Sequence, residues 1–265
     1  MAPTSSSTSR PASACRWWWP TWWRAISSRA SGVDPLTDAA QLAANWAAVR
    51  RRVDEACQAA GRDPAEVTIL PVSKTFGADT VRAALGLGLH RFGENKVQEV
   101  RDKAAALAGE AIEWVVIGHL QTNKAKDVAR LAHEVQSLDR LDLAEALHHR
   151  LQLEGRSLDV LVQVKTASEE SKTGLPPGEL PAFLVALRAY PTLHVRGLMT
   201  LATLSEDAGE VRACFRRLRE LRDRSAAEGH DLPRLSMGMS GDFPLAIAEG
   251  ATEIRIGTAI FGGRH

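Results

Sequence analysis

The stretch VTILPVSK, residues 67–74, is an apolar run that ends on a lysine. Four of its residues are Val, Ile or Leu, which is typical of a buried strand, whereas a lysine is rarely buried without a partner. A strand that simply leaves the core at this point explains Lys74 without any function. The alternative is that Lys74 is a nucleophile, and the rest of the chain is needed to choose between the two.

Seven further apolar runs follow, and helical patterns separate them. Strands that alternate with helices pair in parallel, and mainly apolar strands indicate a sheet covered by helices. Eight such units in about 200 residues predict an α/β fold with a closed (β/α)8 (TIM) barrel; an open doubly wound sheet is the alternative. Pro71 cannot donate to a ladder, so an irregularity is expected there. The seven runs are residues 90–95, 113–118, 133–139, 158–165, 193–201, 234–240 and 252–260.

The barrel domain is expected to begin with a helix over residues 35–60, because Asp34-Pro35 is a typical helix start. Residues 1–33 are expected to be a disordered or wrongly assigned extension, and residues 34–265 one domain. The extension is rich in Ser, Thr, Pro and Ala, and it contains RWWWPTWWRA at residues 16–25. That apolar run is shorter than the ~20 residues a membrane span needs, so an interfacial anchor is the only membrane alternative.

The composition excludes several classes of function. A net charge of +1 over 265 residues gives no reason to expect nucleic-acid or membrane partners. The three cysteines are far apart, form no metal-type spacing and no disulfide framework, and fit a reducing compartment. We therefore expect a cytoplasmic protein without a metal site.

The loops after the last two strands carry a phosphate-type pattern. In barrels of this kind the chemistry lies at the C-terminal ends of the strands, and the loops after strands 7 and 8 are the usual phosphate site. Glycine lets backbone N–H groups approach an anion, and hydroxyl groups add donors. Ordinary turn residues are the alternative explanation. The residues concerned are Ser236, Gly238, Ser240 and Gly241 around the first loop, and Gly257 and Thr258 in the second.

Lys74 and Arg255 add to this pattern, because strands 1 and 8 are neighbours in a closed barrel. A lysine beside a phosphate site suggests a phosphorylated carbonyl compound held as a Schiff base, either pyridoxal 5′-phosphate (PLP) or a sugar phosphate. Arg255 lies two residues before Gly257 and so faces the same side of the strand. In PLP sites an Asp or Arg faces the pyridine nitrogen. An internal ion pair of Arg255 with Asp139 or Glu94 is the alternative.

A series of short motifs resembles, in order, the PLP homeostasis proteins (YggS/PROSC family). This resemblance covers residues from about 36 to 264, and it implies a single fold-type III barrel like the N-terminal domain of alanine racemase, without the C-terminal β-domain. It further implies PLP on Lys74, phosphate contacts from Ser236, Ser240, Gly257 and Thr258, Arg255 at the pyridine nitrogen and Asn95 beside the cofactor. The motifs are LPVSKT, FGEN-VQE, IGHLQTNK, QSLD, EESKTGL, RGLMT, LSMGMSGD and EIRIGTAIFG.

The chain departs from the family pattern at a few positions, which leaves the lining of the pocket mouth open. None of these positions belongs to the implied lysine or phosphate contacts. They are Pro71, Phe76, Lys96, which replaces a usual Tyr, and Val115, which replaces a common His.

The resemblance implies supply and buffering of PLP, a form of vitamin B6, rather than turnover. A racemase needs two bases, and the single tyrosine, Tyr190, precedes strand 6 at the wrong end of the barrel. An always charged Arg255 also leaves the pyridine nitrogen unprotonated, which weakens the ring as an electron sink. We therefore expect a non-catalytic carrier, with a racemase-like enzyme of weak amino-acid activity as the alternative and a Schiff-base aldolase as a more distant one. His119 is the one candidate for a second base.

Partners and assembly follow only from the resemblance. Apo forms of PLP-dependent enzymes are the expected partners, and a monomer is the expected state. Lys172, in EESKTG, is either a solvated loop lysine or a second, transient PLP site.

Overall fold

Eight parallel strands form a single sheet in the computed structural model, which describes residues 39–167, 169 and 173–263. Seven neighbouring pairs are hydrogen-bonded in the order β1-β8-β7-β6-β5-β4-β3-β2. The eight predicted strands are all present; seven have shorter bounds, and β4 keeps its predicted length but begins and ends one residue earlier. They are β1 (Thr68–Pro71), β2 (Arg91–Glu94), β3 (Glu113–Val116), β4 (Ala132–Leu138), β5 (Leu158–Gln163), β6 (Leu193–Met199), β7 (Arg234–Ser236) and β8 (Glu253–Ile256).

The sheet closes between β1 and β2 through a single bridge, so the fold is the predicted barrel rather than an open sheet. Val72 bridges Gly93, and the Ser73 N–H donates to the Gly93 carbonyl at 3.1 Å. Pro71 lies at the end of β1, and its register with β8 is continuous. The N–H groups of Thr68 and Val72 donate to β8, so the nitrogen of Pro71 faces β2, and because it carries no proton it leaves the β1–β2 seam one donor short. The irregularity expected at Pro71 is therefore the sparse β1–β2 seam.

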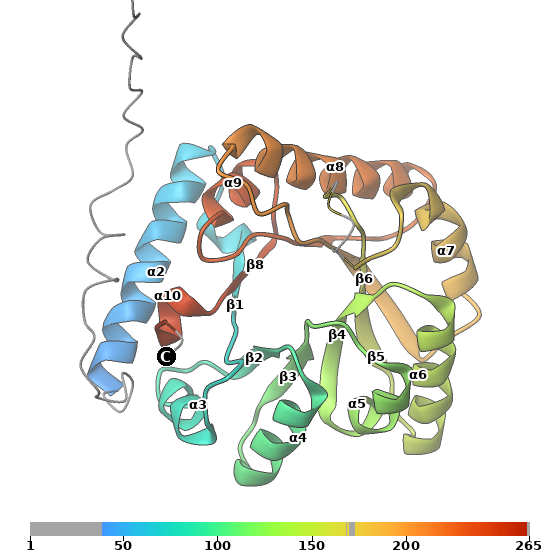
Figure 1. Ribbon diagram of the computed structural model, residues 1–265, viewed down its shortest axis with the longest axis horizontal. Helices are drawn as coiled ribbons and strands as arrows, with labels where there is room; N and C mark the ends of the chain where they lie inside the picture. Colours follow the sequence, from blue (N-terminus) through green and yellow to red (C-terminus); the bar gives the residue numbers. More distant parts are fainter. Residues whose placement is uncertain (1–38, 168, 170–172, 264–265) are drawn as a thin grey trace, which may run out of the picture. The chain divides into compact units, whose positions relative to one another are not determined.

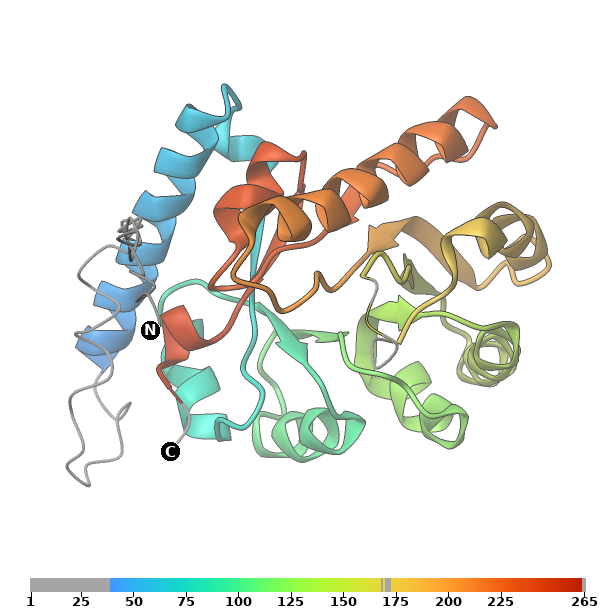
Figure 2. The same cartoon turned by 45° about the horizontal axis from the view of Figure 1, so that its top comes forward.

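Helices cover the outside of the barrel (Figure 1). Figure 2 shows the long helices α2 and α8 on the outside, and α9 contacts both of them. The start of the first helix at Asp34-Pro35 lies outside the described residues. The α-helices are α2 (Ala39–Ala59), α3 (Ala78–Leu85), α4 (Val97–Ala106), α5 (Ala125–Leu131), α6 (Leu141–Glu154), α7 (Leu180–Leu187), α8 (Ala208–Ala227), α9 (Phe243–Ala248) and α10 (Thr258–Phe261), and the 3-10 turns are η1 (Pro64–Glu66), η2 (Thr122–Lys124) and η3 (Pro177–Glu179).

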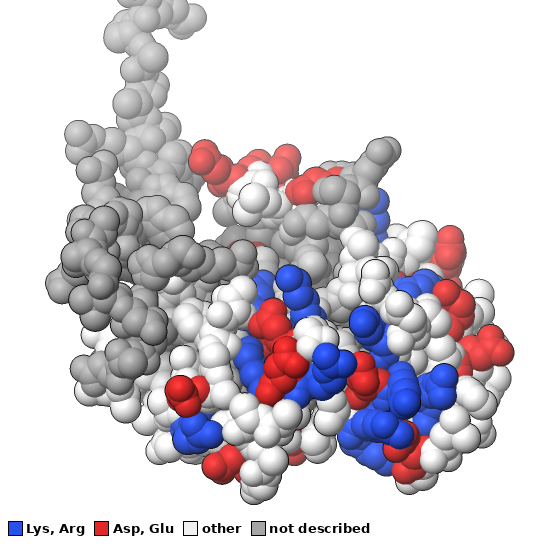
Figure 3. Space-filling view, turned by 60° about the horizontal axis from the view of Figure 1, so that its bottom comes forward, with Lys and Arg blue, Asp and Glu red and all other residues white. Residues whose placement is uncertain are grey.

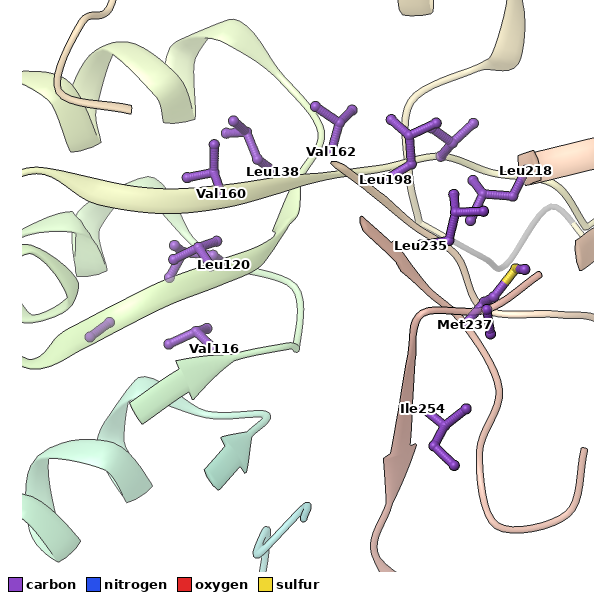
Figure 4. Close-up of a cluster of buried hydrophobic side chains, with 14 of the residues drawn as sticks. Val116, Leu120, Leu138, Val160, Val162, Leu198, Leu218, Leu235, Met237 and Ile254 are labelled. Atoms are coloured by element: carbon purple, nitrogen blue, oxygen red, sulfur yellow. The ribbon is translucent and has the colours of Figure 1, made fainter. Parts of the chain in front are cut away.

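The apolar core lies between the sheet and the helices. Leu218 of α8 packs beside Leu198 of β6 and Leu235 of β7, and Val160 of β5 lies near Leu138 of β4 (Figure 4). All five side chains are buried. Burial of a side chain of this size contributes about 1.5–3 kcal/mol, so each residue of this layer stabilises the packing of the helices on the sheet.

The barrel interior is polar where barrels of this class are usually filled by branched apolar residues. At the N-terminal end, Arg91 and Arg234 each bind both Glu134 and Glu253 at distances between 2.5 and 2.7 Å. Burial alone would raise the pKa of Glu253, but the two arginines hold it below its ordinary value. The Gln136 amide donates to both carboxylates, Glu134 and Glu253, and so extends this hydrogen-bond network toward the middle of the barrel.

Neither a candidate membrane span nor a candidate metal-binding group is found among the residues that the structure describes. No helix among these residues is long and apolar enough to cross a bilayer. No group of three or more His, Cys, Asp or Glu side chains in the same residues is arranged to hold a metal ion.

Candidate cofactor site at the C-terminal end of the barrel

Lys74 lies at the C-terminal end of β1, directly beside β8. Leu70 and Val72 face the barrel interior, since an added Cβ at Gly93 would meet both of their side chains. Lys74 is the next residue in this alternation, and its side chain is half-buried. The Val72 N–H donates to the Ile256 carbonyl at 2.9 Å, which ties the segment before the lysine to the strand before Gly257. The predicted adjacency of strands 1 and 8 is thus present, and Lys74 lies two residues beyond the last hydrogen bond between them.

The loops after β7 and β8 lie in contact with each other. The Ser240 hydroxyl accepts a hydrogen bond from the Ala259 N–H at 3.4 Å, so the first loop contacts the start of α10. Gly257 lies so close to β1 that an added Cβ would be 3.1 Å from the Val72 carbonyl oxygen. Thr258 is the first residue of α10. These residues therefore share one region next to Lys74, with glycine where the backbones approach most closely.

Gly238 fixes the shape of the first loop. Its φ of 95° lies in the left-handed region, and an added Cβ would be 2.6 Å from the Ala246 Cβ and 3.0 Å from the Phe243 Cα. Its carbonyl accepts from the Arg255 N–H at 2.9 Å, which joins β8 to the same loop. Only glycine fits this position without displacing α9.

Arg255 is a buried cation in the barrel interior, with 3% of its surface exposed. Its guanidinium donates to the Ser236 hydroxyl and to the Thr200 carbonyl, both at 2.7 Å. Burial lowers the pKa of Arg255 to about 10, with Glu253 and Asp242 opposing the shift. The group therefore keeps its charge at neutral pH. Among the described residues its hydrogen bonds and ion pairs include neither Asp139 nor Glu94, the two alternatives considered from the sequence.

Ser236 lies deeper in the barrel than its predicted role as a phosphate contact suggests. It is fully buried, its O–H donates to Gln136 at 2.7 Å, and its oxygen accepts from Arg255. A hydroxyl group has a single proton to donate, so Ser236 has none left for a phosphate in this arrangement. Together, Arg255, Ser236 and Gln136 connect the C-terminal end of the barrel to the charged network at its other end.

Asn95, at the end of β2, is held close to the loop after β3. An added Cβ at Gly118 would be 2.3 Å from the Asn95 carbonyl oxygen, so only glycine permits this approach. The Ile117 N–H donates to the Glu94 carbonyl at 2.9 Å just before it. The structure thus places the backbone of Asn95 at the same end of the barrel as Lys74.

His119, the candidate for a second base, and Tyr190, the single tyrosine, lie at opposite ends of the barrel. His119 follows β3, with Nδ1 3.8 Å from Asp139 Oδ2, and its side chain is 49% exposed. Tyr190 precedes β6 at the N-terminal end of the barrel, and its ring packs against His148 at a centroid distance of 5.5 Å. Lys172 lies outside the described residues.

A cluster of charged residues behind Lys74 was missed in the sequence analysis. Lys103 of α4 is buried, and its Nζ lies 2.5 Å from Glu94 Oε1 and 3.5 Å from Glu99 Oε2. Glu94 is fully buried, and its Oε2 is the one buried side-chain polar atom without a partner among the described residues. Burial raises the pKa of Glu94 to about 7, although Lys103 and Ser73 oppose the shift. The sequence feature that could have revealed this cluster is the i, i+4 spacing of Glu99 and Lys103.

The arrangement fits a small phosphorylated aldehyde. Lys74 offers a primary amine, Gly257 and Ser240 border a region where backbone and hydroxyl groups reach an anion, and Arg255 supplies a cation beneath them. A cavity of about 510 Å³ lies elsewhere, on the outer side of β1 against α2. It lacks a lysine and is no part of this site.

Comparisons with known proteins identify the family of this chain. Residues 37–265 match the family described as alanine racemase, N-terminal domain. A pyridoxal phosphate homeostasis protein of Pseudomonas aeruginosa is 45% identical over 84% of this chain and 96% of its own length. Another, from Aquifex aeolicus, is 42% identical over 82% of this chain and 95% of its own length.

A solved structure extends the likeness to three dimensions. PipY of Synechococcus elongatus, with PLP bound, is 36% identical, has a TM-score of 0.73, and covers 83% of this chain and 100% of its own. With identities of this size across nearly the whole length of its relatives, the chain belongs to the family of pyridoxal phosphate homeostasis proteins.

Proposed function

We propose that this protein binds PLP as a Schiff base on Lys74 and takes part in PLP homeostasis, with little or no catalysis. The observation that carries the proposal is the position of Lys74, which follows β1 on the C-terminal side of the buried Arg255, whose strand, β8, pairs with β1. The family supports it, since relatives are named for PLP homeostasis and PipY has been solved with PLP. PLP supplies an aldehyde, a phosphate and a pyridine nitrogen.

Each group of the cofactor has a candidate partner. Lys74 Nζ, as the free amine, attacks the aldehyde carbon, and one water leaves as the C=N bond forms. Ser240, Gly257 and Thr258 hold the phosphate. Arg255 faces the pyridine nitrogen, and because its pKa of about 10 keeps it charged, it leaves that nitrogen without a proton.

Asn95 and Ser236 complete the proposed site. Asn95 borders the ring at the end of β2. Ser236 acts mainly by orienting Arg255, because its O–H is already directed to Gln136.

Borohydride trapping tests this proposal. The purified protein, loaded with PLP, should absorb in the visible range, and reduction followed by peptide mapping should label Lys74. Lys74→Ala should lose the chromophore. Lys165→Ala is the matched control, because Lys165 also follows a barrel strand and is half-buried. A chromophore that survives in Lys74→Ala, with label on another lysine, would show that the wrong residue was chosen.

Exchange at the α-carbon of amino acids separates a carrier from an enzyme. The PLP-loaded protein should exchange the α-proton of alanine for deuterium very slowly, because Arg255 withholds a proton from the ring nitrogen. Arg255→Glu, if it still holds PLP, should exchange faster. Rapid exchange by the unmodified protein that is lost in His119→Ala would favour the enzyme alternative.

We further propose a cytoplasmic monomer that supplies PLP to apo-enzymes. The two described cysteines, Cys57 and Cys214, are buried free thiols, which supports a reducing compartment. Light scattering tests the monomer. Transfer of PLP from the loaded protein to an apo-enzyme, followed as recovered activity with and without a trap for free PLP, tests direct supply.

A further inference from the structure

The turn that carries Lys74 has an unusual backbone. Thr75 has a φ of 72°, and it is the one non-glycine residue with a positive φ in the described part of the chain. A β-branched residue strongly disfavours this conformation, so surrounding contacts must maintain it. The backbone conformation of Thr75 helps to set the direction in which the Lys74 side chain leaves the backbone.

One contact acts directly on this residue. Glu99 Oε2, from α4, accepts the Thr75 N–H at 2.7 Å. Burial would raise the pKa of Glu99, but the Thr75 N–H and Lys103 hold it below its ordinary value, so the acceptor is a carboxylate at neutral pH. A charged acceptor makes this a stronger hydrogen bond than a neutral one.

Two more contacts act on the residue before the lysine. Lys103 Nζ donates to the Ser73 carbonyl at 2.8 Å, and the Ser73 hydroxyl donates to Glu94 Oε1 at 2.6 Å. Lys103 also binds Glu94, so both contacts belong to one buried cluster. The residues on both sides of Lys74 are therefore held by the same group of side chains.

The cluster lies on the opposite side of the chain from the cofactor site. Leu70 and Val72 face the barrel interior, so Ser73 faces the helices, where α4 supplies Glu99 and Lys103. All of these contacts bind the turn on the side that faces the helices. Lys74 lies on the opposite side, which faces the barrel interior.

We propose that Glu94, Glu99 and Lys103 are positioning residues, which hold the Lys74 turn in the conformation that captures PLP. The proposal deepens the proposed function and rests on Lys74 as the PLP lysine. Glu99 acts on the conformation of Thr75, and Lys103 with Glu94 fixes Ser73. None of the three touches the cofactor.

Amide hydrogen exchange in the protein without PLP tests the positioning directly. Glu99→Ala should speed exchange of the Thr75 amide about tenfold or more, since a hydrogen bond to a charged group is lost. Glu99→Gln keeps an oxygen acceptor, so its Thr75 amide should exchange at nearly the rate of the unmodified protein. Asp102→Ala is the matched control, because Asp102 is an exposed acid of the same helix whose side chain binds Gln98.

The rate of PLP capture gives the second measurement, followed by visible absorbance and borohydride labelling of Lys74. Glu99→Ala should slow capture, and adding Thr75→Gly to it should restore the rate, because glycine adopts a φ of 72° without strain. The rescue shows that Glu99 acts through the conformation of Thr75. If Glu99→Ala does not fold, the double variant should, for the same reason.

The outcomes separate this proposal from the one it rests on. Normal labelling of Lys74 together with unchanged exchange and capture in Glu99→Ala would overturn the positioning role and leave the proposed function intact. A double variant that recovers neither folding nor rate would also overturn it. Labelling of another lysine in the unmodified protein would refute the proposed function, while the exchange measurement would still report on the turn.

Discussion

Arg255 shows how a single buried charge is maintained in this barrel. Two hydrogen bonds of 2.7 Å, to the Ser236 hydroxyl and the Thr200 carbonyl, replace part of its hydration. Glu253, two residues earlier on the same strand, favours the charged form. Burial of an arginine without such groups costs several kcal/mol. The hydrogen-bond network through Ser236 and Gln136 is therefore needed to keep Arg255 charged inside the barrel.

Ser236 and Ser240 should therefore respond differently to the same substitution. Ser236→Ala leaves one donor of Arg255 without its acceptor, and we expect a loss of about 1–3 kcal/mol in the free energy of unfolding. Ser240→Ala should leave stability nearly unchanged and weaken PLP binding through the phosphate. Urea unfolding and PLP titration of both variants measure the two effects. Equal stability of both variants would remove the supporting role of Ser236.

Glu94 should make stability depend on pH. Its pKa in the folded protein is about 7, against an ordinary value of 4.5. The folded state therefore keeps a proton that the unfolded chain has released, and this group's contribution to stability falls as the pH rises from about 4.5 to 7. Above pH 7 the penalty is constant, on the order of 3 kcal/mol.

Glu94→Gln removes this titration and should flatten that part of the profile. Urea unfolding at several pH values between 4.5 and 8 gives the difference between the two proteins. Glu113→Gln serves as the control, because Glu113 is exposed and begins the neighbouring strand. Parallel profiles for the unmodified protein and Glu94→Gln would mean that Lys103 keeps Glu94 ionised throughout.

At the scale of elements, the strands were predictable and the contacts inside the barrel were not. Alternation of apolar runs with helical patterns indicated all eight strands. All of the observed strands except β4 are shorter than predicted, because the predicted runs included loop residues at their ends. The chain from Gln136 to Ser236 and Arg255 depends on which residues of three strands face inward. β4 contains a register shift between Val135 and Leu138, which changes that assignment. Hydrophobic pattern carries no signal for such a shift.

The loop after β7 gives an element-scale prediction. Gly238→Ala places a Cβ 2.6 Å from Ala246 at a φ of 95°, and we expect a loss of about 2–4 kcal/mol from overpacking and backbone strain. Gly241→Ala, on the same loop, meets no atom within 4 Å and should change stability by less than about 0.5 kcal/mol. Thermal unfolding measures both. A tolerated Gly238→Ala would show that α9 moves to accommodate it.

At the scale of the whole molecule, charge is distributed without a dominant sign. The face shown in Figure 3 carries lysine and arginine side chains with acidic side chains between them, in keeping with a net charge of +1. Arg212, Arg216 and Arg219 of α8 all lie within 4.0 Å of Glu249, so even this basic helix has acidic partners. A net charge of +1 therefore gives no reason to expect that the protein attracts polyanions over long distances.

Residues 1–33 provide the prediction that concerns the whole chain. The match to the family begins at residue 37, and the described residues belong to one compact unit, Pro35–His265. The Ser, Thr and Pro content of the first 15 residues gives little apolar surface to bury. A chain that begins at Val33 should therefore unfold at the same temperature as the full chain and bind PLP with the same affinity. A second variant, with the five tryptophans of residues 17–23 replaced by serine in the full chain, separates the effect of those side chains from that of length. A fall in unfolding temperature in both variants would show that the tryptophans pack against the barrel, and would extend the domain to include them.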